Sequence, residues 1–200
     1  MTPGATYRSA RFRVTLVLIS IAITACQSNG VVETLDARSG LTIVTEKAPV
    51  IYARTLSQFS RSARDYLYLG PVEINERGVR EYYLWIGMAS TIDRAYLVVE
   101  SSEPGLMILD VPGDPLEFEL GAWDERVPRL AGREIYDPAV TPARVYSARV
   151  THDQIALIAS SKPERVLMLG EQTSPTEYFL WEEGPEWPSY STDDPLTGSD

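Results

Sequence analysis

Residues 72–88 decide the fold, and they read VEINERGVREYYLWIGM. Residues 79–88 alternate in an extended chain, with Val79, Tyr83 and Trp85 on one side and Tyr82, Leu84, Ile86 and Met88 on the other. Both sides are mostly apolar, so we expect a strand that is covered on both faces. Because the preceding Asn75-Glu76-Arg77-Gly78 has turn-forming residues, the sequence predicts a β-hairpin of 72–74 and 79–88.

Short apolar segments separated by Pro and Gly continue this pattern along the chain. Leu116-Glu117-Phe118-Glu119-Leu120 alternates strictly between apolar and acidic residues, which predicts a half-buried strand. Further strands are predicted at 96–99, 107–111, 145–150 and 165–169. Several short strands at this spacing are typical of a mainly β fold, either a sandwich or a partly open barrel.

One segment departs from the β pattern. Thr151 and Gln154 stand at the two positions of a capping box, which predicts the start of a short helix near 151–161. Ile155, Ile158 and Ala159 form an apolar face on this helix, and the helix is expected to stop before Pro163. The order of strand, helix and strand over 145–169 leaves an α+β fold with a mixed sheet as the alternative.

Two parts of the chain resemble each other. Leu-x-Leu-Gly at 67–70 precedes Tyr-x-Leu-Trp at 82–85, and the same pair recurs at 167–170 and 178–181. A duplicated hairpin is one interpretation. Independent use of residues that suit buried strands is the interpretation that we favour.

The N-terminus predicts export. Arg8, Arg11 and Arg13 precede an apolar run at 14–25 that ends in small residues, the pattern of a secretory signal peptide. The run is 12 residues long, whereas about 20 are needed to span a bilayer, so a retained membrane anchor is the weaker alternative.

The stretch Ile23-Thr24-Ala25-Cys26 resembles the lipobox of bacterial lipoproteins. The resemblance implies that Cys26 becomes the first residue of the mature protein and carries fatty acids such as palmitate, the attachment site expected in this chain. An ordinary signal peptide is the alternative. Since Gln27 rather than aspartate follows the cysteine, the resemblance implies outer-membrane attachment facing the periplasm, with the inner membrane or the extracellular face as alternatives.

These observations divide the chain into four parts. We expect a signal peptide at 1–25, the lipidated cysteine and a tether at 26–40, a β-rich globular domain at 41–183, and a flexible acidic tail at 184–200. The tail contains three prolines and four acids but no basic residue, a composition that buries too little apolar surface to fold.

Charge and cysteine content exclude several classes of partner and site. Removal of residues 1–25 takes away three of the 18 basic residues and none of the 28 acids, which leaves a net charge of −13. Such a surface repels nucleic acids and anionic lipid head groups, so nucleic acid is not an expected partner. With Cys26 acylated the mature chain has no free thiol, which excludes disulfides, thiolate metal sites and cysteine nucleophiles.

Catalytic and metal-binding motifs are sparse. His152 is the single histidine and stands beside Asp153, but the chain contains no Gly-x-Ser-x-Gly motif, so we expect an exposed first-turn residue. One histidine without a free thiol is too few ligands for a transition metal. Nine acids lie between residues 93 and 125, some of them in a loop at 110–114. We interpret these acids as a hydrated surface rather than as a calcium site or a catalytic carboxylate pair. No phosphate-binding loop is present.

Two further clusters of residues have both a structural and a functional interpretation. Arg54, Arg61 and Arg64 form either a basic patch or, as we prefer, ion pairs with the protein's own acids. Five aromatic residues line either strand cores or a ligand groove: Tyr82, Tyr83, Trp85, Tyr178 and Trp181.

The function predicted from the sequence is that of a membrane-anchored periplasmic lipoprotein with a binding or structural role in the cell envelope. We expect no catalytic residue, cofactor or metal, and contact with the membrane through the lipid on Cys26. Another envelope protein is the expected partner, bound through a sheet edge. A carboxylate-dependent hydrolase and a small-ligand carrier with an aromatic pocket are the alternatives.

Overall fold

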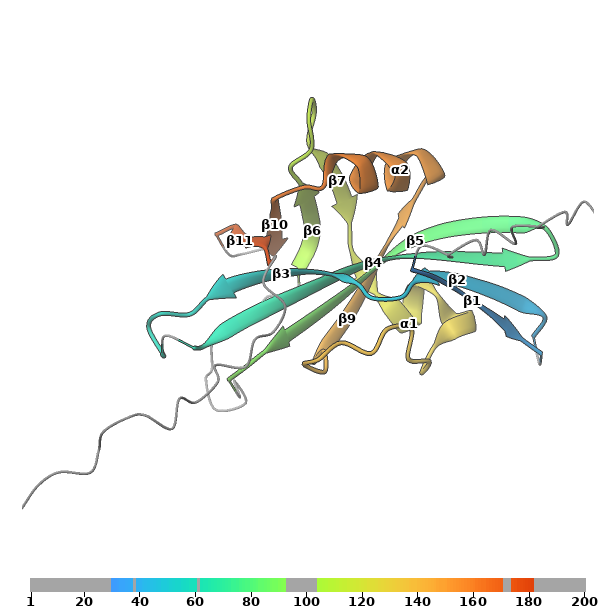
Figure 1. Cartoon of the computed structure of the whole chain (residues 1–200), viewed down its shortest axis with the longest axis horizontal. Helices are drawn as coiled ribbons and strands as arrows, with labels where there is room; N and C mark the ends of the chain where they lie inside the picture. The colour runs from blue at the N-terminus through green and yellow to red at the C-terminus, as the bar shows by residue number, and fades with distance from the viewer. Residues whose placement is uncertain (1–29, 38, 61, 93–103, 171–173, 182–200) are drawn as a thin grey trace, which may run out of the picture.

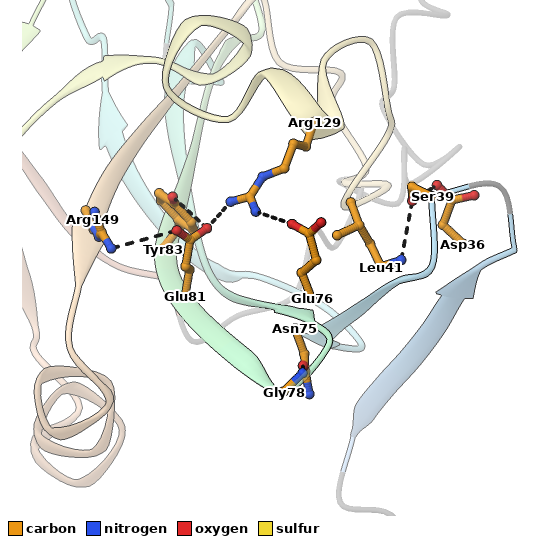
Figure 2. Close-up of polar contacts among 10 residues, drawn as sticks. All are labelled: Asp36, Ser39, Leu41, Asn75, Glu76, Gly78, Glu81, Tyr83, Arg129 and Arg149. Atoms are coloured by element: carbon orange, nitrogen blue, oxygen red, sulfur yellow. Dashed lines mark hydrogen bonds and ion pairs between the residues drawn. The ribbon is translucent and has the colours of Figure 1, made fainter.

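The centre of the fold is a long hairpin of β4 (Arg64–Glu76) and β5 (Val79–Ser90), which pair along their whole lengths. The connecting residues Arg77 and Gly78 have φ angles of 53° and 91°, the left-handed pair of a two-residue hairpin turn. Asn75 Oδ1 accepts a hydrogen bond of 2.9 Å from the Gly78 amide and holds this turn (Figure 2). The predicted hairpin is confirmed, and it is longer than expected.

The computed structural model describes residues 30–37, 39–60, 62–92, 104–170 and 174–181 (Figure 1). The remaining strands are β1 (Val31–Asp36), β2 (Leu41–Glu46), β3 (Val50–Thr55), β6 (Pro104–Leu109), β7 (Leu116–Glu119), β8 (Gly121–Ala122), β9 (Arg144–Val150), β10 (Arg165–Gly170) and β11 (Thr176–Leu180). The helices are α1 (Trp123–Arg126), the 3-10 turn η1 (Pro128–Leu130) and α2 (His152–Ser161).

The strands form one antiparallel sheet that nearly closes into a barrel. Its order is β7-β6-β10-β11-β3-β4-β5-β9-β8, with β2 joining the far half of β4 and β1 pairing with β2. The strands β7 and β8 are almost continuous in the chain. Because β7 pairs with β6 and β8 pairs with β9, the two ends of the sheet meet there. The prediction of a mainly β fold with one short helix is confirmed.

Two hydrophobic cores lie on opposite faces of the β4–β5 hairpin. The core inside the barrel includes Leu84 and Ile86, whereas Tyr83 and Trp85 belong to an outer core covered by α1, η1 and the following loop. The two-faced strand predicted from 79–88 is therefore confirmed. Tyr136, from that loop, packs its ring against the backbone of β4.

A glycine makes this packing of Tyr136 possible. A Cβ atom at Gly70 would lie 2.5 Å from Tyr136 Cε2, so only glycine fits beneath the ring. The Tyr136 hydroxyl donates a 2.6 Å hydrogen bond to the Pro71 carbonyl, which satisfies its polar end.

The α+β alternative with a mixed sheet was wrong. Every strand pair among the described residues is antiparallel, and β9 and β10 are separated because β9 lies beside β5 while β10 lies between β6 and β11. Strand, helix and strand do follow one another, but α2 lies over one end of the barrel (Figure 1) instead of crossing the face of the sheet.

Part of the segment expected as a tether at 26–40 is a strand, because Val31–Asp36 form β1 and pair with β2. The first five residues of β1 are exposed, so the strand is held by main-chain pairing and leaves no burial pattern in the sequence. Strands β2 and β3 were also not predicted from the sequence. The signal peptide, Cys26, the strand predicted at 96–99 and the acidic tail lie outside the described residues.

The two similar sequence pairs both form hairpins, but with different registers. Leu69 pairs with Ile86 and faces the barrel interior in the β4–β5 hairpin. In the second hairpin Val166 pairs with Tyr178, and these residues take the interior positions. The similarity therefore does not extend to equivalent pairing.

Candidate functional site

Helix α2 is built as a separate cover over one end of the barrel. The Gln154 amide donates to Thr151 Oγ1 at 3.2 Å, and the Thr151 amide donates to Gln154 Oε1 at 2.8 Å, which completes the predicted capping box. The helix ends at Lys162, whose φ of 47° turns the chain, and Pro163 follows. Within the described residues of α2, none is buried.

An apolar cavity of about 440 Å³ is lined jointly by α2 and the barrel strands. Its roof is the predicted apolar face of the helix, formed by Ile155, Ile158 and Ala159. Ile155 and Ile158 are partly buried: they pack against the interior core of the barrel and also line the cavity. The volume falls within the range of about 300–1,000 Å³ that is usual for ligand pockets.

The floor of the cavity comes from strands that are distant in the sequence. It is formed by Tyr52 of β3, Leu69 of β4, Leu84 of β5 and Leu180 of β11. These residues belong to the interior core or pack against it, so the floor is apolar and firmly placed.

Tyr52 is the aromatic residue of this floor. Its hydroxyl donates a 3.0 Å hydrogen bond to the Pro163 carbonyl, which ties β3 to the end of α2. Burial raises the pKa of Tyr52 to about 12, so the phenol is neutral at physiological pH. Since its polar end is already bonded, Tyr52 presents an apolar ring to the cavity.

Charged groups lie only at the rim of the cavity. Glu46 stands at the end of β2, and Lys162 stands at the end of α2; both are exposed. Ala48 and Val50 complete the rim between β2 and β3. An apolar interior with charges at its edge suits an amphiphile whose hydrocarbon part enters the cavity.

A second recess of about 530 Å³ lies on the other side of Lys162 and Pro163. Its wall includes Arg165, which contacts Asp110 at 2.8 Å and Glu177 at 3.7 Å. These ion pairs engage Asp110 and Arg165, and the recess is also lined by the charged Lys162 and Glu164, so the more apolar cavity beneath α2 is the stronger candidate site.

The five aromatic residues considered as a ligand groove do not form one. Tyr83 and Trp85 belong to the outer core, while Tyr82 and Tyr178 pack with the interior core on the other side of the sheet. Trp181 lies edge-on to Tyr66 with ring centroids 6.4 Å apart. The groove hypothesis was wrong, because alternation along each strand sends neighbouring aromatic residues to opposite faces.

His152 lies at the exposed start of α2. Its side chain is 70 % exposed, its Nδ1 atom is 3.8 Å from Asp153 Oδ1, and its ring lies against that of Tyr82 at 5.6 Å. It therefore has the position predicted for an exposed first-turn residue.

Among the described residues, the acids are engaged in ion pairs or lie on the surface. Arg129 of η1 contacts both Glu76 and Glu81 of the hairpin, and Arg149 of β9 approaches Glu81 at 3.8 Å (Figure 2). This network joins η1 and β9 to β4 and β5. Within the described ranges, no group of three or more His, Cys, Asp or Glu side chains is arranged to hold a metal ion.

The arginines at 54 and 64 do not form a basic patch. Arg54 pairs with the buried Asp65 at 2.5 Å, as the preferred interpretation predicted. Arg64 lies over the ring of Trp181, with its guanidinium carbon 4.7 Å from the centroid. Arg61 lies outside the described residues.

The roof of the cavity was predictable from the sequence, but the cavity was not. The apolar face of α2 and its capping box were both predicted, and nothing in the 3.6-residue period shows whether such a face meets a core or an empty space. The floor residues carried no signal beyond that of ordinary strand cores.

Comparisons with known proteins leave the site to be interpreted from its own geometry. No known family model, characterised protein or solved structure matches this chain. In the part of the chain that the structure describes, no helix is both long and apolar enough to cross a membrane.

Proposed function

We propose that this protein is a lipid-anchored, non-catalytic binding protein of the cell envelope that holds an apolar ligand in the cavity beneath α2. The observation that carries the proposal is the apolar face of α2, which lies over about 440 Å³ of apolar space. Exposing apolar surface to water is unfavourable. A ligand that fills this space removes its own apolar surface and that of the helix from water, which stabilises the complex.

The anchor in this proposal is the acylated Cys26. The basis is the lipobox-like Ile23-Thr24-Ala25-Cys26, together with Gln27, which favours the outer membrane and the periplasmic side. A chain with this anchor remains bound to the membrane while its folded domain is exposed to the periplasm.

The anchor is tested by replacing its cysteine. The Cys26→Ser variant is expected to incorporate no radiolabelled palmitate and to retain its signal peptide. It is also expected to be absent from the lipid-modified proteins of the envelope. Unchanged palmitate labelling in this variant would contradict the anchor.

The binding site is tested with an uncharged apolar fluorophore, N-phenyl-1-naphthylamine, added to the mature chain carrying Cys26→Ser. Saturable binding of one probe per chain is expected. Ala159→Trp places a large side chain at the roof, where it competes with the probe for space, and is expected to weaken binding about tenfold, which corresponds to about 1.4 kcal/mol.

Ala156→Trp is the matched control for the blocked cavity. Ala156 is exposed on the same helix and does not line the cavity, so the same substitution there leaves probe affinity unchanged. Equal affinities of the two tryptophan variants would refute the binding site.

A second candidate function is recruitment of an envelope protein through β1. This strand pairs with β2, and Val31, Val32 and Leu35 are 44 %, 43 % and 67 % exposed, so the strand offers apolar side chains beside a sheet edge. A photo-crosslinking residue at Leu35 is expected to give a discrete adduct in cells, and the same residue at Leu157 of α2 is expected to give none. Adducts of the same pattern at both positions would contradict this second role.

A further inference from the structure

The chain enters the fold beside the mouth of the cavity. The Gly30 carbonyl accepts a hydrogen bond from the Lys47 amide, and Val31 pairs with Glu46 at the start of β1. Glu46 and Ala48, on either side of Lys47, both line the cavity. The first described residue is therefore fixed at the rim.

The distance from this rim to Cys26 is limited by the chain itself. Four residue steps separate Cys26 from Gly30, and a fully extended chain of this length reaches at most about 14 Å. The tether expected from the sequence ended at Gly40. Because β1 begins at Val31, the connection is much shorter and holds the rim close to the acylated residue.

We infer that the cavity opens toward the membrane surface and takes the acyl chain of a phospholipid from the bilayer that anchors the protein. The inference rests on the proposed anchor and cavity, and adds the source and class of the ligand. An anchor at the rim means that a lipid enters the cavity without first crossing the aqueous phase, where exposed hydrocarbon is unfavourable.

The charges at the rim favour a zwitterionic head group. Lys162 and Glu46 are exposed residues of opposite charge that both line the cavity. A phosphoethanolamine head group offers the complementary pair, with its phosphate toward Lys162 and its ammonium toward Glu46. The net charge of −13, from 15 basic and 28 acidic residues in the mature chain, disfavours an anionic lipid.

The orientation is tested with the lipidated protein in vesicles of phosphatidylethanolamine and phosphatidylcholine. Since acylation leaves no free thiol, a cysteine introduced as Ala48→Cys or Ala131→Cys accepts an environment-sensitive fluorophore at one position. Ala48 lies at the rim, whereas Ala131 follows η1, and the adjoining α1 lies on the side of the fold away from α2 (Figure 1). Nitroxide-labelled phospholipid is expected to quench the label at Ala48 severalfold more than the label at Ala131.

The short connection is tested by lengthening it. An insertion of roughly twelve Gly and Ser residues after Asn29 allows the domain to move away from the bilayer. We expect this insertion to remove the difference in quenching between the two labels. Equal quenching in the protein without the insertion would overturn the proposed orientation.

The source of the acyl chain is tested by recovering the ligand. The lipidated protein is incubated with vesicles of the same two phospholipids, purified, and examined by native mass spectrometry; one bound phosphatidylethanolamine per chain is expected, and less of it with Lys162→Glu. If the lipidated protein takes up no phospholipid while the Cys26→Ser chain does, the cavity holds an acyl chain of Cys26 itself, and the inference is wrong. If the Cys26→Ser chain binds no naphthylamine probe either, the proposed binding function fails separately.

Discussion

The roof of the cavity is expected to matter more for ligand binding than for folding, and the double variant Ile155→Ala/Ile158→Ala measures this. Each substitution removes three carbons, equivalent to about 2.4 kcal/mol of transfer free energy at about 0.8 kcal/mol per methylene. Because both side chains are partly buried in the free protein, we assign about half of this free energy to folding and half to the ligand that covers them. The double variant is therefore expected to lose about 2 kcal/mol of binding free energy, which makes Kd about thirtyfold weaker.

Two controls separate binding from stability. Ile86→Ala removes the same atoms from a fully buried position in the barrel, and is expected to lower the free energy of unfolding by about 2–5 kcal/mol. Leu157→Ala removes a side chain of similar size from the outer face of α2, where it is 40 % exposed, and leaves Kd unchanged.

Urea unfolding followed by fluorescence gives the stabilities, and titration with N-phenyl-1-naphthylamine gives Kd. Excess probe is also expected to stabilise the unsubstituted chain more than the double variant, because ligand binding to the native state shifts the unfolding equilibrium. The reasoning is refuted if the double variant loses as much stability as Ile86→Ala and binds the probe normally, since α2 would then be a packed part of the core.

Three further variants or conditions test the elements that hold the site. Thr151→Ala removes the capping box, and is expected to lower the free energy that holds α2 by about 1 kcal/mol and to speed amide exchange in that helix about fivefold, measured by hydrogen–deuterium exchange; unchanged exchange would show that the cap contributes nothing. Gly70→Ala drives a methyl group into the Tyr136 ring and is expected to lower the free energy of unfolding by about 1–3 kcal/mol in thermal unfolding, with a smaller loss when Tyr136→Leu is also present. Burial raises the pKa of Tyr52 from 10.0 to about 12, so its contribution to stability is complete below about pH 10 and is lost as the pH rises through 12; Tyr52→Phe is expected to flatten the decline of the unfolding free energy over this window, and an equally steep decline in both proteins would contradict this assignment.

Much of the fold was predictable because its strongest signals are local. The alternation of 79–88 identified a strand with two apolar faces, and the turn residues before it located the hairpin. The helix at 152–161 followed from Thr151 and Gln154, whose side chains bond to backbone groups only three residues away. Such short-range features act before any distant segment is in place.

The errors have physical causes as well. Strand β1 escaped prediction because its side chains stay exposed and its stability comes from pairing with β2. The mixed sheet was a reasonable alternative since strand, helix and strand often form a parallel unit, but here α2 is only ten residues long and covers a barrel end.

The chain's local chemistry was enough to predict the hairpin, the capped helix and the mainly β character, because each depends on residues close together in the sequence. The closure of the sheet and the cavity were decided only in three dimensions. Leu84 of β5, Ile158 of α2 and Leu180 of β11 all line the cavity. Whether an apolar face contacts a filled core or borders a cavity depends on how such distant segments pack.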